Sequence, residues 1–106
     1  MSERSSIFGL AAQLEFVQAS EYYRNISPQL KQKFRMAFDT ALEEIIVFPE
    51  AWPQIEGTPV RTRQLRGFPY SMIYVDDPDA VYIVAVAHQQ REPLYWRERL
   101  EEPGRE

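Results

Sequence analysis

The chain has 106 residues, which is long enough for one domain with a substantial core and too short for two. Hydrophobic residues make up 44% of the chain and charged residues 26%, a balance that is typical of a folded domain and not of a disordered one. The formal net charge of -4 argues against a surface that binds nucleic acid all over the molecule, although it leaves room for a local basic patch.

Cysteine is absent, so disulfides and thiolate metal sites are excluded, and residence in the cytoplasm is the simplest expectation. The single His88 cannot form a cluster of histidine metal ligands, and we expect neither a metal nor a cofactor. No apolar run approaches the roughly 20 residues of a membrane-spanning helix, and no signal peptide opens the chain. We therefore expect no membrane association.

The N-terminal half predicts a short strand over residues 5–8 and then two helices. Apolar residues recur at helical spacing over residues 10–24, which predicts the first helix. Ser27 can cap a second helix, and Pro28 suits its first position because the missing N–H is not needed there. This helix should end near Phe48, since Pro49 disfavours helical geometry in the residue before it. Its apolar face is predicted to cover a sheet and consists of Leu30, Phe34, Phe38, Ala41, Ile45 and Phe48.

A proline-rich loop with Trp52, which we expect to pack over an edge of the core, leads to a predicted three-stranded meander. In the first segment, residues 60–66, arginines break the apolar alternation, which favours a β-bulge there. The second and third segments, residues 70–75 and 80–87, are apolar on both faces. The third is therefore predicted to be a central strand, with Val81, Ile83 and Ala85 on one face and Tyr82, Val84 and Val86 on the other.

Turn signals separate these strands at Gly67-Phe68-Pro69 and at the acidic cluster of residues 76–79. After the third strand, Glu92-Pro93-Leu94 predicts a short C-terminal helix that carries Tyr95, Trp96 and Leu100 and stops at Pro103-Gly104. Glu98 and Arg99 are interpreted as solvated charges. The aromatic pairs at positions 22 and 23 and at positions 95 and 96 are interpreted as packing residues of the core or its rim.

Several of these pieces, in this order, resemble the RelE/ParE superfamily of bacterial toxins. The pieces are Glu21-Tyr22-Tyr23, Phe48-Pro49-Glu50-Ala51-Trp52-Pro53, Arg66-Gly67-Phe68-Pro69-Tyr70, Val84-Ala85-Val86-Ala87-His88 and Tyr95-Trp96-Arg97. The resemblance implies a single α+β domain over residues 1–106, of order β-α-α-β-β-β, with a helical hairpin on a small, mixed, mainly antiparallel sheet. It also implies the toxin half of a type II toxin–antitoxin system, paired with a cognate antitoxin and able to form larger toxin–antitoxin complexes.

The resemblance leaves two activities open, because RelE-like members cleave messenger RNA on the ribosome and ParE-like members poison DNA gyrase. A RelE-like endoribonuclease site in this chain would draw on His88, Arg66, Arg91 and Tyr95. Most such toxins are basic and this chain is acidic, which disfavours docking among ribosomal phosphates. We therefore favour the ParE-like, plasmid-stabilising branch. A third alternative is a non-toxic interaction module of the same fold.

RNA cleavage by a 2′-hydroxyl needs a base, an acid and cations that stabilise the charged phosphorane. His88 could be acid or base, because its ordinary pKa of about 6.5 allows both forms near neutrality, or it could simply fix a turn. Arg61, Arg63 and Arg66 could hold phosphate, or with Trp52 they could form the docking face for an acidic antitoxin segment. In either case we expect at least two of these guanidinium groups to be exposed together.

Overall fold

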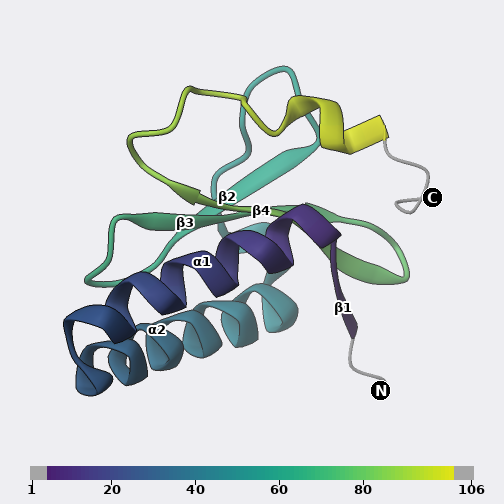
Figure 1. The fold of residues 1–106 in the computed structure, drawn as a ribbon. Helices are drawn as coiled ribbons and strands as arrows, with labels where there is room; N and C mark the ends of the chain where they lie inside the picture. The colour runs from purple at the N-terminus through teal and green to yellow at the C-terminus, as the bar shows by residue number, and fades with distance from the viewer. Residues whose placement is uncertain (1–4, 102–106) are drawn as a thin grey trace.

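The computed structural model describes residues 5–101 and shows a helical hairpin packed on one face of a four-stranded sheet (Figure 1). The elements in chain order are β1 (Ser5–Phe8), α1 (Leu10–Ile26), α2 (Pro28–Val47), η1 (Pro49–Ala51), β2 (Val60–Gln64), β3 (Tyr70–Asp76), β4 (Ala80–His88) and η2 (Arg97–Glu101). This arrangement confirms the predicted α+β class and the predicted order of helices and strands.

The two helices begin and end close to where local sequence signals place them. The Ser27 Oγ accepts a hydrogen bond from the Leu30 N–H at 3.0 Å, so Ser27 is the predicted cap of α2, with Pro28 in the first turn. The last residue of α2 is Val47, one position before Phe48. None of the helices within residues 5–101 is both long and apolar enough to cross a membrane.

The sheet has the strand order β1-β4-β3-β2, with β1 parallel to β4 and the other pairs antiparallel. The predicted short strand at residues 5–8 is confirmed as β1. The interior position predicted for the third meander strand, β4, is also confirmed. The β1 strand is only four residues long, so it pairs with the first half of β4, from Ala80 to Ile83, and does not reach the second half.

The β-bulge lies in a different place from the one the sequence predicts. The strand β2 pairs with β3 without any register shift, so the prediction of a bulge there is wrong. The shift falls between β3 and β4 instead, where Ile73 pairs with Ala85 and Tyr74 pairs with Ile83, leaving Val84 as the extra residue. The alternation assigned to this strand therefore breaks at the bulge, and Val84 and Ala85 face the same side of the sheet.

The sheet is covered on both faces, which explains why β3 and β4 are apolar on both parities. On the helix side, the core includes Phe34, Phe38 and Ile45 of α2 with Met72, Tyr74, Val81, Ile83 and Val86 of the sheet. On the opposite side, the C-terminal segment covers Val60, Ile73, Val75, Tyr82, Val84 and Ala85 with Trp96, which is only 3% exposed (Figure 1).

The C-terminal segment forms turns followed by the 3-10 helix η2, and not the predicted helix carrying Tyr95 and Trp96, which both lie before η2. Leu94 has a φ angle of 64°, in the left-handed region, and a residue in that conformation interrupts a right-handed helix. The predicted stop at Pro103-Gly104 lies outside the described residues.

Candidate functional site

Glu15 on α1 is the polar centre that joins the hairpin, the sheet and the C-terminal segment. Its carboxylate accepts hydrogen bonds from the Val86 N–H at 2.9 Å, from the Tyr95 hydroxyl at 2.7 Å and from both terminal nitrogens of Arg99 at 3.0 and 2.8 Å. Arg99 also donates to the Val84 carbonyl at 3.1 Å. Two side chains thus satisfy backbone groups on the part of β4 that β1 is too short to reach.

These contacts fix the ionisation of Glu15 and Tyr95. Burial raises the pKa of Glu15, but hydrogen bonds from Arg99, Tyr95 and Val86 outweigh it, and the pKa is lowered overall. Glu15 is therefore an anion near neutrality. Burial, and then the hydrogen bond to Glu15, raise the pKa of Tyr95, which keeps its hydroxyl protonated as a donor. Tyr95, one of the predicted catalytic residues, is thus bonded to Glu15 within the fold.

The interpretation of Arg99 as a solvated charge is wrong, because its side chain is 18% exposed and paired with a Glu15 side chain that is 12% exposed. The two residues are 84 positions apart, and no local spacing links them. The only hint in the sequence is that α1 carries a carboxylate beside its apolar face.

His88 and Arg91 line one small hollow of about 180 Å³, together with Tyr22 and Tyr70. The His88 ring meets the Tyr70 ring edge-on at 5.0 Å, and its Nδ1 accepts a hydrogen bond from the Gln90 N–H at 3.0 Å. That bond agrees with the alternative in which the histidine fixes a turn. The Arg91 guanidinium lies 3.8 Å from the centre of the Tyr95 ring, so the fold brings three of the four predicted catalytic residues together.

The two arginines of β2, Arg61 and Arg63, make most of their contacts within the fold. The Arg63 guanidinium stacks over Trp52 at 4.4 Å and forms a 2.6 Å ion pair with Glu44, and the side chain is only 12% exposed. The Arg61 guanidinium donates to the carbonyl groups of Trp52 at 2.8 Å and Glu50 at 3.4 Å. Trp52 is half-buried against the core, as predicted for an anchor at its edge.

Of the three clustered arginines, Arg66 is exposed and Arg61 and Arg63 are only partly exposed, so the predicted pair of exposed guanidinium groups stays a prediction. Arg66 lines a hollow of about 330 Å³ between α2 and the β2–β3 turn, with Met36 and Arg63 among its neighbours. It does not line the hollow that contains His88. The predicted catalytic set is thus divided between two places on the surface.

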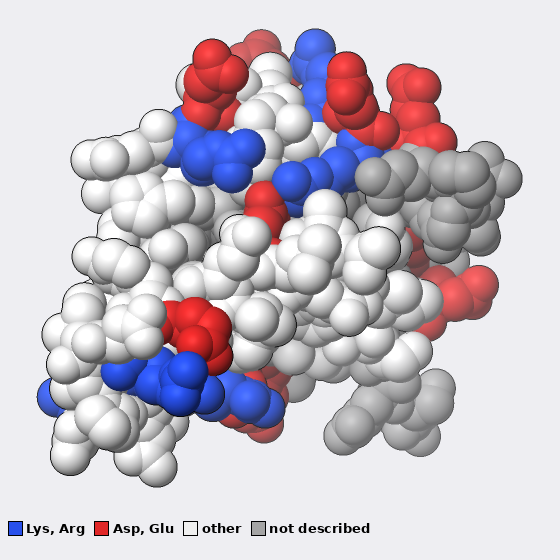
Figure 2. All heavy atoms as spheres, viewed as in Figure 1, with Lys and Arg blue, Asp and Glu red and all other residues white. Residues whose placement is uncertain are grey.

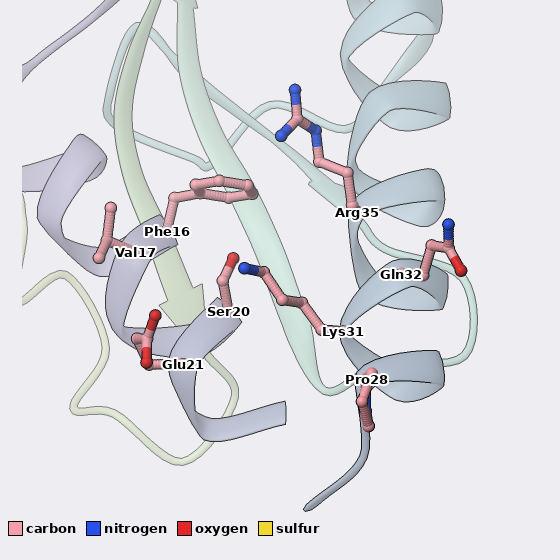
Figure 3. Close-up of a pocket in the computed structure, with 8 residues that line it drawn as sticks. All are labelled: Phe16, Val17, Ser20, Glu21, Pro28, Lys31, Gln32 and Arg35. Atoms are coloured by element: carbon pink, nitrogen blue, oxygen red, sulfur yellow. The ribbon is translucent and has the colours of Figure 1, made fainter. Parts of the chain in front are cut away.

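A groove between α1 and α2, which the sequence did not predict, is hollowed into the surface of the hairpin. One half has a volume of about 600 Å³ and the other about 450 Å³, and both halves share Phe16, Val17 and Arg35. We call this continuous feature the hairpin groove. In its first half the Phe16 ring lies at the centre, and Lys31 of α2 extends towards Ser20 of α1 (Figure 3).

Within residues 5–101, no three histidine or carboxylate side chains come together in a group that could hold a metal ion.

A helical hairpin on a mixed four-stranded sheet is consistent with the fold of the RelE/ParE superfamily of toxins. A family model described as "ParE toxin of type II toxin-antitoxin system, parDE" matches residues 7–93. The chain therefore belongs to the ParE toxin family.

A solved structure shares this fold and comes from the "Chromosomal ParDE TA system from P. aeruginosa". It matches with a TM-score of 0.70 and 17% sequence identity, and the match covers 81% of this chain and 96% of that chain. No curated protein sequence gives a significant match.

Proposed function

We propose that the chain is a cytoplasmic toxin that inhibits DNA gyrase by binding to it, and that a cognate antitoxin neutralises it. Membership of the ParE toxin family supports this proposal, because gyrase is the target that the resemblance to ParE-like members implies. One observation favours binding over RNA cleavage. Several of the predicted catalytic and phosphate-binding side chains are already bonded to other groups of the same chain.

RNA cleavage requires free cations and free acid–base groups around one phosphate. The Tyr95 hydroxyl already donates to Glu15, and its raised pKa keeps it from acting as a base near neutrality. Arg61 and Arg63 donate to backbone carbonyls or to Glu44. Groups that already make bonds within a fold have fewer donors and less freedom to surround a phosphate, which favours a toxin that acts through its surface.

One observation favours the alternative of a ribosome-dependent endoribonuclease. His88 and Arg91 line the same hollow, so an acid–base group and a cation lie near each other. Arg66 lines a different hollow, so in this alternative Arg91 would have to supply the cation that stabilises the phosphorane. The non-toxic interaction module is the third alternative, which a test of growth addresses directly.

The test compares wild-type protein with His88→Ala, and uses Gln89→Ala as a matched control at an exposed neighbouring position. Purified protein should inhibit supercoiling by gyrase, and expression in bacteria should cause DNA breaks and an SOS response while messages stay intact. Both variants should retain this toxicity. Codon-positioned cuts in translated messages that disappear in His88→Ala, without loss of stability, would establish the endoribonuclease instead. Normal growth with well-folded protein would establish the non-toxic module.

A further inference from the structure

We propose that the hollow lined by Tyr22, Tyr70, His88 and Arg91 is where the chain docks on its target, and that it takes an acidic side chain of the gyrase surface. We call it the Arg91 hollow. This inference rests on the proposed function, in which the chain inhibits gyrase by binding to it. It adds the surface that makes the contact and the chemical group of the partner that the surface holds.

The first support is the charge of the Arg91 hollow. Glu15 and Arg91 are the acidic and basic side chains that line it beside His88, and the Glu15 carboxylate is already paired with Arg99 at 2.8 Å. Arg91 is exposed, and within residues 5–101 it has no acidic side chain at ion-pair distance. The wall of the hollow therefore carries a positive charge that the described part of the chain does not neutralise, and such a charge attracts an anionic group of a partner.

The second support is that the fold holds this cation in place. The Arg91 guanidinium lies 3.8 Å from the centre of the Tyr95 ring, and the Tyr95 hydroxyl donates to Glu15 at 2.7 Å. The turn that carries Arg91 is closed by a hydrogen bond from the Arg91 N–H to the His88 carbonyl at 3.0 Å, and the Gln90 N–H donates to the His88 Nδ1 at 3.0 Å. A side chain held in this way loses little freedom when a partner binds, so more of its attraction appears as affinity.

The third support is the composition of the rim. Tyr22 is 59% exposed, and Ile26, one turn further along the same side of α1, is 57% exposed. Burial raises the pKa of Tyr70, so its hydroxyl stays protonated as a donor. Figure 2 shows Lys and Arg side chains over the C-terminal segment at the upper left, beside a broad uncharged area that extends down to α1. Tyrosine and arginine are enriched at the centres of protein interfaces and among the residues that dominate binding, so this rim suits a protein partner.

The size of the hollow and the number of its cations identify the occupant. Its volume of about 180 Å³ is smaller than the roughly 300–1,000 Å³ of sites for small molecules, so it suits one side chain better than a nucleotide. Proteins that bind nucleic acid neutralise several phosphates with several cations. Here one guanidinium lines the hollow, and Arg66 lines a different one. A carboxylate on the surface of a protein therefore fits this site better than a nucleic-acid backbone.

The experiment measures the binding of purified gyrase to the immobilised chain by surface plasmon resonance. Arg91→Glu should weaken the affinity by about 30-fold or more, because it turns an attraction for the partner's carboxylate into a repulsion. Arg97→Glu is the matched control, since it makes the same change of charge at an exposed position of the C-terminal segment that does not line the hollow. That control should bind like wild type.

A second variant tests the opposite wall of the hollow without changing its charge. Tyr22→Ala should weaken the affinity about tenfold, and Phe48→Ala, which removes an aromatic ring that is 63% exposed and lies outside the hollow, should leave it unchanged. His88→Ala should still bind and inhibit gyrase, because Arg91 keeps its support from the Tyr95 ring. All variants are compared by thermal unfolding, so that a loss of fold is separated from a loss of contact.

The outcomes separate this inference from the proposed function. If wild type binds gyrase and both Arg91→Glu and Tyr22→Ala bind equally well, the docking site is wrong and the proposed function stands. If wild type does not bind gyrase, both proposals fail. If Arg91→Glu loses affinity for a DNA duplex in fluorescence anisotropy but keeps its affinity for gyrase free of DNA, the occupant is a phosphate and the inference is overturned. It is also overturned if translated messages are cut and both His88→Ala and Arg91→Glu abolish the cuts, because the hollow would then be a nuclease site.

Discussion

Replacing Glu15 with Ala should destabilise the fold more than any other substitution of a charged residue on α1. The change removes one carboxylate that accepts four hydrogen bonds, and it breaks the ion pair with Arg99, whose side chain is only 18% exposed. It also leaves the Val86 N–H and the Tyr95 hydroxyl without this acceptor. Breaking a buried ion pair by removing one partner costs about 3–5 kcal/mol.

Such a loss is a large part of the total, because domains of this size have unfolding free energies of about 5–15 kcal/mol. Urea titration followed by circular dichroism measures it directly. Glu21→Ala is the matched control, since Glu21 lies on the same helix and pairs with Arg24, but both side chains are about half exposed at 48% and 55%. That control should lose no more than about 0.5 kcal/mol.

The pH dependence of stability provides an independent check on the same carboxylate. The pKa of Glu15 is lowered in the folded state from its ordinary value of 4.5, so its contribution is complete above that value and is lost as the pH falls through the folded pKa. The difference in unfolding free energy between wild type and Glu15→Gln should therefore shrink as the medium becomes acidic. A loss below about 1 kcal/mol at neutral pH for Glu15→Ala, or a difference that grows in acid, would refute the account of this site.

Three further predictions concern the fold. Phe38→Ala should cost about 3–5 kcal/mol by denaturant titration, because the ring is 5% exposed in the helix-side core, and a loss under about 1 kcal/mol would contradict that packing. Ser27→Ala should cost about 1 kcal/mol, since the cap bond to Leu30 is lost, and an unchanged midpoint would exclude a role for that bond. Backbone amides of β4, Ala80–His88, should exchange most slowly, and fast exchange there would contradict its interior position.

The features that the sequence predicted correctly depend on neighbouring residues. Ser27 and Pro28 determine the start of α2 through a hydrogen bond and a backbone angle that involve only the next few residues. The interior position of β4 follows from its apolar residues on both faces, because no other place in the sheet buries both.

The features that the sequence missed depend on residues that meet only after folding. The Glu15–Arg99 pair joins residues 84 positions apart, and the Arg63–Glu44 pair joins residues 19 positions apart. In each pair the arginine has a structural role, although the sequence alone suggests a surface charge. The bulge at Val84 is likewise a property of the pairing between two strands, and the alternation within one strand does not reveal it.

The distribution of charge over the surface affects partner binding more than the net charge does. The Debye length at physiological ionic strength is about 8 Å, whereas the molecule extends 38 × 34 × 23 Å. Charges on one side of the molecule are therefore largely screened from a partner on another side, and nearby ion pairs, such as Arg24 with Glu21 and Arg35 with Asp39, decide the local field. The net charge of -4 consequently cannot exclude a ribosomal substrate by itself. The stronger argument against RNA cleavage is local, because Arg61, Arg63 and Tyr95 already have partners within the fold.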